Sequence, residues 1–207
     1  MLSPGIWGDR RVMRIGLLGG SFNPGHVGHL HLSHTAKKYL SLDQVWWLVT
    51  PKNPLKKSMD IPSTSERIRC ASNLDLPPWI HLTDLELSYK TKYTSATLKK
   101  LIIRYPKANF IWLMGADNLV QISMWVNWTS IFDKVRIAVF DRGTDRYKSL
   151  FSKASIKYKK NRVSISRPTY VWYKSAPSWV FFPSKKVDLS SSQIRSLNTQ
   201  KRGVRVF

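Results

Sequence analysis

The most informative segment of the chain is Gly19–His29, with the sequence Gly-Gly-Ser-Phe-Asn-Pro-Gly-His-Val-Gly-His. It follows the apolar run Arg14–Leu18, which predicts a buried strand, and precedes a stretch that predicts a helix. Free backbone N–H groups and the positive end of the helix dipole would point at whatever lies above the strand, and phosphate is the natural ligand there. His26 and His29 are three residues apart at the helix start, so both imidazoles can face one anion. Gly28 between them permits a nucleotide to approach the backbone closely.

Two imidazoles aimed at one phosphate suit in-line attack at phosphorus, because donors around the non-bridging oxygens lower the barrier without a covalent intermediate. The alternatives are an ordinary glycine turn followed by surface histidines, or a metal site that also uses His31 and His34. No two of these histidines have the four-residue spacing of helical zinc ligands, and no carboxylate or cysteine lies nearby. The segment therefore favours phosphate chemistry.

The same segment resembles the signature of the nucleotidyltransferase superfamily that carries an H-x-G-H motif. Class I aminoacyl-tRNA synthetases share that motif, so His26 to His29 alone leave the family open. Six further segments follow along the chain: Thr50–Lys57, Glu86–Leu87, Tyr93–Leu98, Gly115–Leu119, Trp125–Ile131 and Leu189–Arg195. In this order, and from about Arg14 to Leu197, the chain resembles the bacterial nicotinate-mononucleotide adenylyltransferases.

The resemblance implies transfer of AMP from ATP to nicotinate mononucleotide, which gives nicotinate adenine dinucleotide and pyrophosphate in NAD biosynthesis. The implied catalytic residues are Ser21, His26, His29 and Arg195. The implied ATP-binding residues are Gly19, Gly20, Ser21, Phe22, His26, Gly28, His29, Gly115, Asp117, Ser190, Ser191, Ser192, Ile194 and Arg195. The implied mononucleotide-binding residues are Asn23, Lys56, Lys57, Tyr93, Thr94, Ser95, Asp117 and Trp125. Mg²⁺ is expected to enter through the ATP phosphates, because the motifs offer no carboxylate cage of their own.

Several of these residues also have plainer interpretations. Ser190–Ser192 could be an ordinary helix cap, and at least one lysine of the 56–57 pair could be solvated. Asp117 follows a strand end, where it could accept hydrogen bonds from ribose hydroxyls or cap a helix. Trp125 offers a face on which a pyridine ring could stack, whereas Trp128 is more typical of a core residue.

Three departures from the family pattern limit the resemblance. Asn23 stands where many relatives have Asp, and Leu55 lies where many bacterial members have a histidine. The chain ends at Phe207, where relatives usually continue with another helix. We therefore leave the oligomeric state open.

Strand-like and helix-like segments alternate, which predicts an α/β chain with a Rossmann-like three-layer fold and a mainly parallel sheet. Strands are expected at 14–18, 44–49, 82–87, 109–114, 135–140 and 180–182. Helices are expected at 26–40, 63–73, 94–104, 116–132 and 191–197. Residues 1–13 are expected as an extension, 14–199 as one domain with an irregular basic surface insertion at about 141–178, and 200–207 as a basic tail.

The composition is strongly basic, with 34 Lys and Arg against 12 Asp and Glu and a net charge of +22. Such a field attracts nucleotides, nucleic acid or anionic membranes, or reflects only a lysine-rich surface. A basic nucleic-acid-binding protein is therefore one alternative, and an adenylyltransferase acting on nicotinamide mononucleotide or another small acceptor is the other. We see no apolar run long enough for a membrane span and no secretory signal. The single cysteine, Cys70, is expected to be buried and agrees with a cytoplasmic location.

Overall fold

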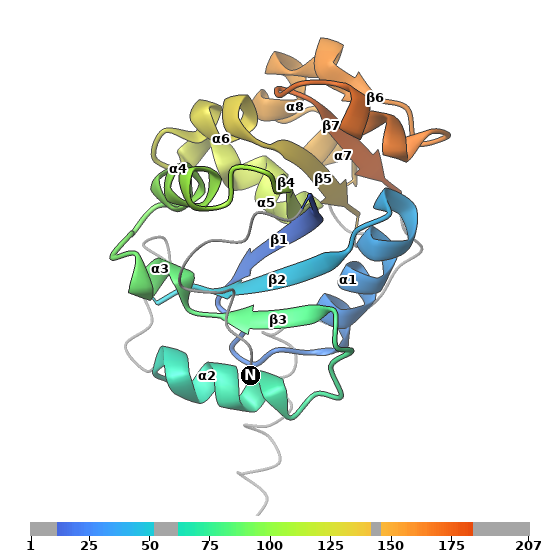
Figure 1. Cartoon of the computed structure of the whole chain (residues 1–207). Coiled ribbons are helices and arrows are strands. Elements are labelled where there is room, and N and C mark those ends of the chain that lie inside the picture. Colours follow the sequence, from blue (N-terminus) through green and yellow to red (C-terminus); the bar gives the residue numbers. More distant parts are fainter. Residues whose placement is uncertain (1–11, 52–61, 142–145, 184–207) are drawn as a thin grey trace, which may run out of the picture.

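A computed structural model of the chain describes residues 12–51, 62–141 and 146–183. Their strands form a seven-stranded sheet in which every neighbouring pair is parallel, with helices on both faces (Figure 1). The order of the strands is β3-β2-β1-β4-β5-β7-β6. The strands are β1 (Arg14–Gly20), β2 (Gln44–Val49), β3 (Ile80–Thr83), β4 (Asn109–Gly115), β5 (Arg136–Phe140), β6 (Arg162–Val163) and β7 (Trp179–Phe182). The Rossmann-like fold expected from the sequence is confirmed.

The two central strands determine where a ligand can bind. Strands β2 and β3 lie on one side of β1, and β4, the next strand in the chain, lies on its other side. The two strands pair in register, with Leu18 opposite Leu113 near their carboxyl ends. Open parallel sheets bind ligands at such a switch in strand order, beyond the carboxyl ends of the strands. The glycine turn lies at this point.

Helices cover the sheet because each buries one apolar face against it. The helices are α1 (Val27–Leu40), α2 (Thr64–Ser72), α3 (Leu85–Ser88), α4 (Thr94–Arg104), α5 (Ala116–Gln121), α6 (Trp128–Lys134), α7 (Arg146–Leu150) and α8 (Lys153–Lys157), with short 3₁₀ turns η1 (Ile122–Met124), η2 (Lys159–Asn161) and η3 (Pro168–Tyr173). One hydrophobic cluster includes Leu98 of α4 and Ile131 of α6. The other, on the opposite face, includes Ala36 of α1 and Val171 of η3.

Local sequence signals explain where several helices begin and end. Helix α2 starts with a capping box, in which the Glu66 N–H donates to Ser63 Oγ at 3.2 Å and the Ser63 N–H donates to Glu66 Oε2 at 2.8 Å. Helix α4 ends at Arg104, two residues before Pro106, as expected. None of the described helices has both the length and the apolar character needed to cross a bilayer.

Four sequence-based expectations are wrong. The strand expected at 82–87 ends at Thr83, because Thr83 Oγ1 accepts the Leu85 N–H at 3.2 Å and the chain turns into α3. The helix expected at 116–132 is interrupted at Trp125, and Asn127 adopts a left-handed φ of 53°. Cys70 is exposed rather than buried.

The fourth correction concerns the basic insertion, which is not irregular where the structure describes it. Residues 146–183 form α7, α8, β6, η3 and β7, and the edge strand β6 pairs with β7. Ala154 and Val171 from this segment are fully buried, in the clusters on opposite faces of the sheet. This part of the chain therefore completes the core instead of only covering it.

Candidate active site

The turn between β1 and α1, residues 19–29, brings the two histidines together; we call it the histidine loop. His26 is the N-cap of α1, and its Nδ1 accepts the Gly28 N–H at 3.1 Å. The His26 N–H in turn donates to His29 Nδ1 at 3.3 Å. The two ring centroids lie 4.0 Å apart, and both side chains are buried. The prediction that both rings lie at the helix start is confirmed, and they are not surface residues.

These two hydrogen bonds assign the protons on the rings. A nitrogen that accepts an N–H bond carries no hydrogen itself, so in the neutral imidazole the hydrogen is on the other nitrogen. Both histidines are therefore Nε2–H tautomers that present a donor from the far side of the ring. The N–H groups of Gly28 and His29, in the first turn of α1, donate to His26 itself, at its Nδ1 and its carbonyl oxygen. The imidazole N–H groups are therefore the donors suited to phosphate oxygens.

Aromatic packing supports the histidine loop from below. Phe22 has a left-handed φ of 44°, an uncommon conformation for a bulky residue that the surroundings must enforce. Its ring stacks on Trp47 of β2, with centroids 4.9 Å apart, and contacts His29 at 4.7 Å. Trp47 Nε1 donates to Ser33 Oγ, which donates to the His29 carbonyl oxygen, both at 2.8 Å. The loop is thus fixed to β2 as well as to α1.

Gly19 is required because an indole ring lies against it. A Cβ atom at this position would overlap the six-membered ring of Trp112 on β4, with Cζ2 only 2.7 Å away. Trp112 also packs edge-to-face against Trp125, with centroids 6.5 Å apart. A continuous row of contacts therefore joins the histidine loop to Trp125, the residue expected to stack on the pyridine ring.

Asp117 lies just beyond the end of β4, in the first turn of α5. It does not cap that helix, because the N-cap is Gly115. Asp117 Oδ1 is buried and has no hydrogen-bond partner in the described residues. An unsatisfied buried acceptor is unfavourable, so this oxygen is a candidate to accept a hydrogen bond from a ligand hydroxyl.

The residues expected to bind the pyridine ring occupy two contacting segments. Tyr93 is the N-cap of α4, and Thr94 and Ser95 form its first turn. Ser95 Oγ donates to the Val126 carbonyl oxygen at 3.2 Å, which holds the start of α4 against the half-buried Trp125. Trp128 packs against Phe132 and Tyr158, in agreement with a core position.

Some expected site residues fall outside the described part of the chain. They are Lys56 and Lys57, which follow β2 in the sequence, and Ser190, Ser191, Ser192, Ile194 and Arg195 near the C-terminus. Leu55, one of the departures from the family pattern, is also outside it. Their roles stay predictions.

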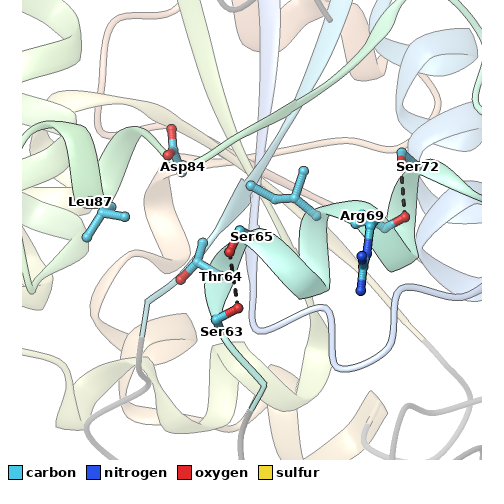
Figure 2. Close-up of a pocket in the computed structure, with 8 residues that line it drawn as sticks. Ser63, Thr64, Ser65, Arg69, Ser72, Asp84 and Leu87 are labelled. Atoms are coloured by element: carbon cyan, nitrogen blue, oxygen red, sulfur yellow. Dashed lines mark hydrogen bonds between the residues drawn. The ribbon is translucent and has the colours of Figure 1, made fainter.

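The described residues contain no group of three His, Cys, Asp or Glu side chains that could hold a metal ion. They do contain an open groove between α2 and α3, shown in Figure 2, which is lined by Ser63, Thr64, Ser65, Ile68, Arg69, Ser72, Asp84 and Leu87. No residue of the histidine loop lines this groove. Its hydroxyl groups largely bond within α2, and we assign it no role.

Comparison with known proteins identifies the family. The model of the cytidylyltransferase-like family matches residues 17–197. A probable nicotinate-nucleotide adenylyltransferase from Ruegeria sp. (strain TM1040) is 40% identical over 183 residues, which are 88% of this chain and 96% of that protein. The chain belongs to the nicotinate-nucleotide adenylyltransferase family. Another member, from Agrobacterium fabrum, is 39% identical over 184 residues, 89% of this chain and 98% of its own length.

Solved structures agree with the fold of this family. The nicotinic acid mononucleotide adenylyltransferase of Plasmodium falciparum complexed with NaAD superposes with a TM-score of 0.65 at 18% identity, over 92% of this chain and 89% of that one. The same enzyme complexed with APC gives a TM-score of 0.63.

One residue at the site was missed by sequence reasoning. Arg67, on α2, is only 2% exposed, and it donates to the Ser21 carbonyl oxygen inside the histidine loop. In the sequence it is one arginine among many, on a helix with a polar N-terminus, and no local pattern distinguishes it from a surface residue.

Proposed function

We propose that the chain transfers the AMP unit of ATP to the phosphate of nicotinate mononucleotide. An oxygen of the mononucleotide phosphate would attack the α-phosphorus of ATP. The bond from that phosphorus to the bridging oxygen would break, and the products would be nicotinate adenine dinucleotide and pyrophosphate. No covalent enzyme intermediate is needed, because the site has only to align the two phosphates and stabilise the charge.

The histidine pair is the observation that carries this proposal. The Nδ1 atoms of His26 and His29 accept main-chain N–H groups and the two rings lie 4.0 Å apart, so both Nε2–H groups would act as neighbouring donors to the α-phosphate oxygens. Ser21 and Arg195 would add donors for the α-phosphate and the leaving pyrophosphate. Glycines 19, 20 and 28 would permit close approach of the nucleotide, and Phe22 would support the turn.

Mg²⁺ would enter bound to the ATP phosphates and neutralise the charge on pyrophosphate as it leaves. The histidine loop would bind phosphate oxygens rather than the metal ion, because imidazole, hydroxyl and main-chain N–H groups suit phosphate oxygens better than they suit Mg²⁺. Asp117 would hold a ribose hydroxyl through its buried Oδ1.

The acceptor would lie between the histidine loop and the start of α4. Trp125 would stack on the pyridine ring, and the first N–H groups of α4, at Thr94 and Ser95, would bind its carboxylate. Tyr93, Asn23 and the lysines at 56 and 57 would complete this half of the site. Because a helix N-terminus attracts negative charge, this site would favour nicotinate, which has a carboxylate, over nicotinamide, which has a neutral amide.

The test is pyrophosphate release from ATP and Mg²⁺ with three acceptors: nicotinate mononucleotide, nicotinamide mononucleotide and phosphopantetheine. We expect turnover to prefer the first and to fall by about 100-fold or more in His29→Ala, as when a transition-state donor is removed. Turnover with a different acceptor would retain the chemistry and overturn the substrate. No release with any acceptor would overturn both.

A second candidate, binding of single-stranded nucleic acid, is favoured by the composition of one segment. Residues 146–183 contain nine Lys and Arg and no Asp or Glu, and Tyr147, Phe151 and Tyr173 are each at least 75% exposed. Basic surfaces with exposed rings bind single strands by charge and stacking. Fluorescence anisotropy with a labelled oligonucleotide would test it. Binding that weakens steeply with salt and in Tyr173→Ser is expected, and no binding at low salt would exclude it.

A further inference from the structure

Arg67 is a buried cation whose guanidinium binds only neutral oxygens in the described part of the chain. Its Nε donates to the Pro62 carbonyl at 2.9 Å, and its Nη2 donates to the Pro51 carbonyl at 3.0 Å and to Thr64 Oγ1 at 3.1 Å. Its Nη1 donates to the Ser21 carbonyl at 2.5 Å. Three separate segments therefore meet at one planar group.

Those three segments are the histidine loop, the turn after β2 and the start of α2. The first two are also joined by Thr50, whose N–H donates to the Gly20 carbonyl at 3.0 Å. Thr50 and Arg67 thus hold consecutive carbonyls, those of Gly20 and Ser21. In the sequence, Pro51 precedes Lys56 and Lys57 by five and six residues.

Arg67 binds the carbonyl next to the residue of the histidine loop that has a left-handed φ. Ser21 immediately precedes Phe22, whose left-handed φ of 44° is unfavourable for a bulky side chain. Phe22 is held on one side by the stacked ring of Trp47. Arg67 holds the preceding carbonyl, so the strained turn is fixed by a ring contact and by a charge-assisted hydrogen bond.

Stability of the fold alone does not explain why this cation is buried, because a buried guanidinium loses its hydration. Burial lowers the pKa of the Arg67 guanidinium from its ordinary value, which reflects the loss of hydration. The carbonyl oxygens of Pro62, Ser21 and Pro51 compensate for that loss by accepting hydrogen bonds from the guanidinium. An apolar side chain would fill the space beneath the loops but would not bind their carbonyls.

We infer that Arg67 is a positioning residue, which sets the geometry of the histidine loop by binding the carbonyl oxygens of Ser21 and Pro51. The inference rests on the proposed adenylyl transfer, in which the histidine loop binds the α-phosphate of ATP. Arg67 itself does not touch the reacting atoms. It acts through the placement of His26 and His29, whose rings follow Ser21 by five and eight residues.

The experiment compares Arg67→Ala and Arg67→Lys with Arg69→Ala, a matched control on the same helix with an exposed side chain (Figure 2). We expect kcat to fall by about 100-fold in Arg67→Ala, as when reacting groups are displaced by about 1 Å, with a much smaller change in KM for ATP. Lysine has one ammonium and cannot span three carbonyls, so Arg67→Lys should recover little. Arg69→Ala should match the wild type.

Two further readouts separate positioning from a general loss of folding. Guanidinium chloride at millimolar concentration, far below denaturing levels, should raise kcat of Arg67→Ala at least tenfold and leave Arg69→Ala unchanged. In ¹⁵N-histidine NMR spectra without substrate, the wild type should show two Nε2–H tautomers for His26 and His29, and Arg67→Ala should show averaged nitrogen shifts.

The outcomes are distinct. Unchanged kcat and unchanged histidine shifts in Arg67→Ala would overturn the inference, as would a lowered kcat with wild-type shifts and no rescue. If Arg67→Ala does not fold, Arg67→Lys decides by the same readouts. If the wild type releases no pyrophosphate, the proposed function fails, whereas the NMR comparison still tests how Arg67 holds the loop.

Discussion

Replacement of Glu86 by glutamine is expected to stabilise the protein at about pH 8 and to have little effect at about pH 4. Glu86 lies on α3 and is only 5% exposed. Burial raises the pKa of Glu86 from 4.5 to about 7, because the carboxylate loses hydration. Glutamine has nearly the same shape and is never charged.

The size of this stabilisation follows from the difference between the pKa of Glu86 in the folded chain and its pKa in the unfolded chain. Below about pH 4.5 the carboxyl is protonated in both the folded and the unfolded chain, so its ionisation does not affect stability. Between about pH 4.5 and 7 the unfolded chain ionises first, so the free energy of unfolding falls as pH rises. Above pH 7 the loss is complete, and a shift of roughly 2.5 pKa units corresponds to about 3 kcal/mol.

Urea unfolding of the wild type and Glu86→Gln, at several values between about pH 4 and pH 8, would measure this difference. Other titrating groups cancel in the comparison, so only the divergence of the two curves matters. Glu66→Gln is the control of opposite sign, because hydrogen bonds from Ser63 lower the pKa of the exposed Glu66. That variant should lose stability above pH 4.5. Parallel curves for the wild type and Glu86→Gln would refute the reasoning.

Three further substitutions test the candidate site. Asp117→Ala should lower kcat/KM for ATP or the mononucleotide by about 10- to 100-fold, the effect of losing one hydrogen bond to a charged acceptor, with an unchanged Tm; wild-type kinetics would contradict the role of Oδ1. Gly19→Ala should cost about 1–3 kcal/mol in urea unfolding, because its Cβ overlaps the Trp112 ring, whereas Gly20→Ala, with its nearest side-chain atom 3.3 Å away, should cost less. Trp125→Ala should raise KM for the mononucleotide by about tenfold and leave KM for ATP unchanged; equal changes in both would argue against stacking.

Much of the fold could be predicted because its signals are local. The bounds of β2 and α4 agree with the structure at both ends, since each is a continuous apolar or amphipathic run with a clear stop. The histidine loop was found by its spacing between a strand and a helix. The sequence could not show that His26 caps α1, because histidine is not a usual N-cap residue. Only the hydrogen bond from the Gly28 N–H reveals this role.

The errors have physical causes that act at longer range or in shorter elements. Helix α3 has four residues, too few for a 3.6-residue period to appear beside an apolar strand. In residues 146–183 the two α-helices are five residues long, and their burial depends on contacts with α5 and η1 rather than on their own pattern. The position of Arg67 depends on carbonyls 16 and 46 residues away, which no local pattern contains.

The contact between Gly19 and Trp112 has a consequence for folding during synthesis. Strand β1 begins at residue 14 and β4 at residue 109, so about 95 residues separate the two strands. At roughly 5–20 residues per second, a ribosome needs on the order of 5–20 s to make the second strand after the first. Until then β1 can pair only with β2, and Gly19 lacks its contact with the indole of Trp112. The histidine loop is therefore made well before the strand that completes its support, and during that interval the edge of β1 that β4 will cover is open to a chaperone.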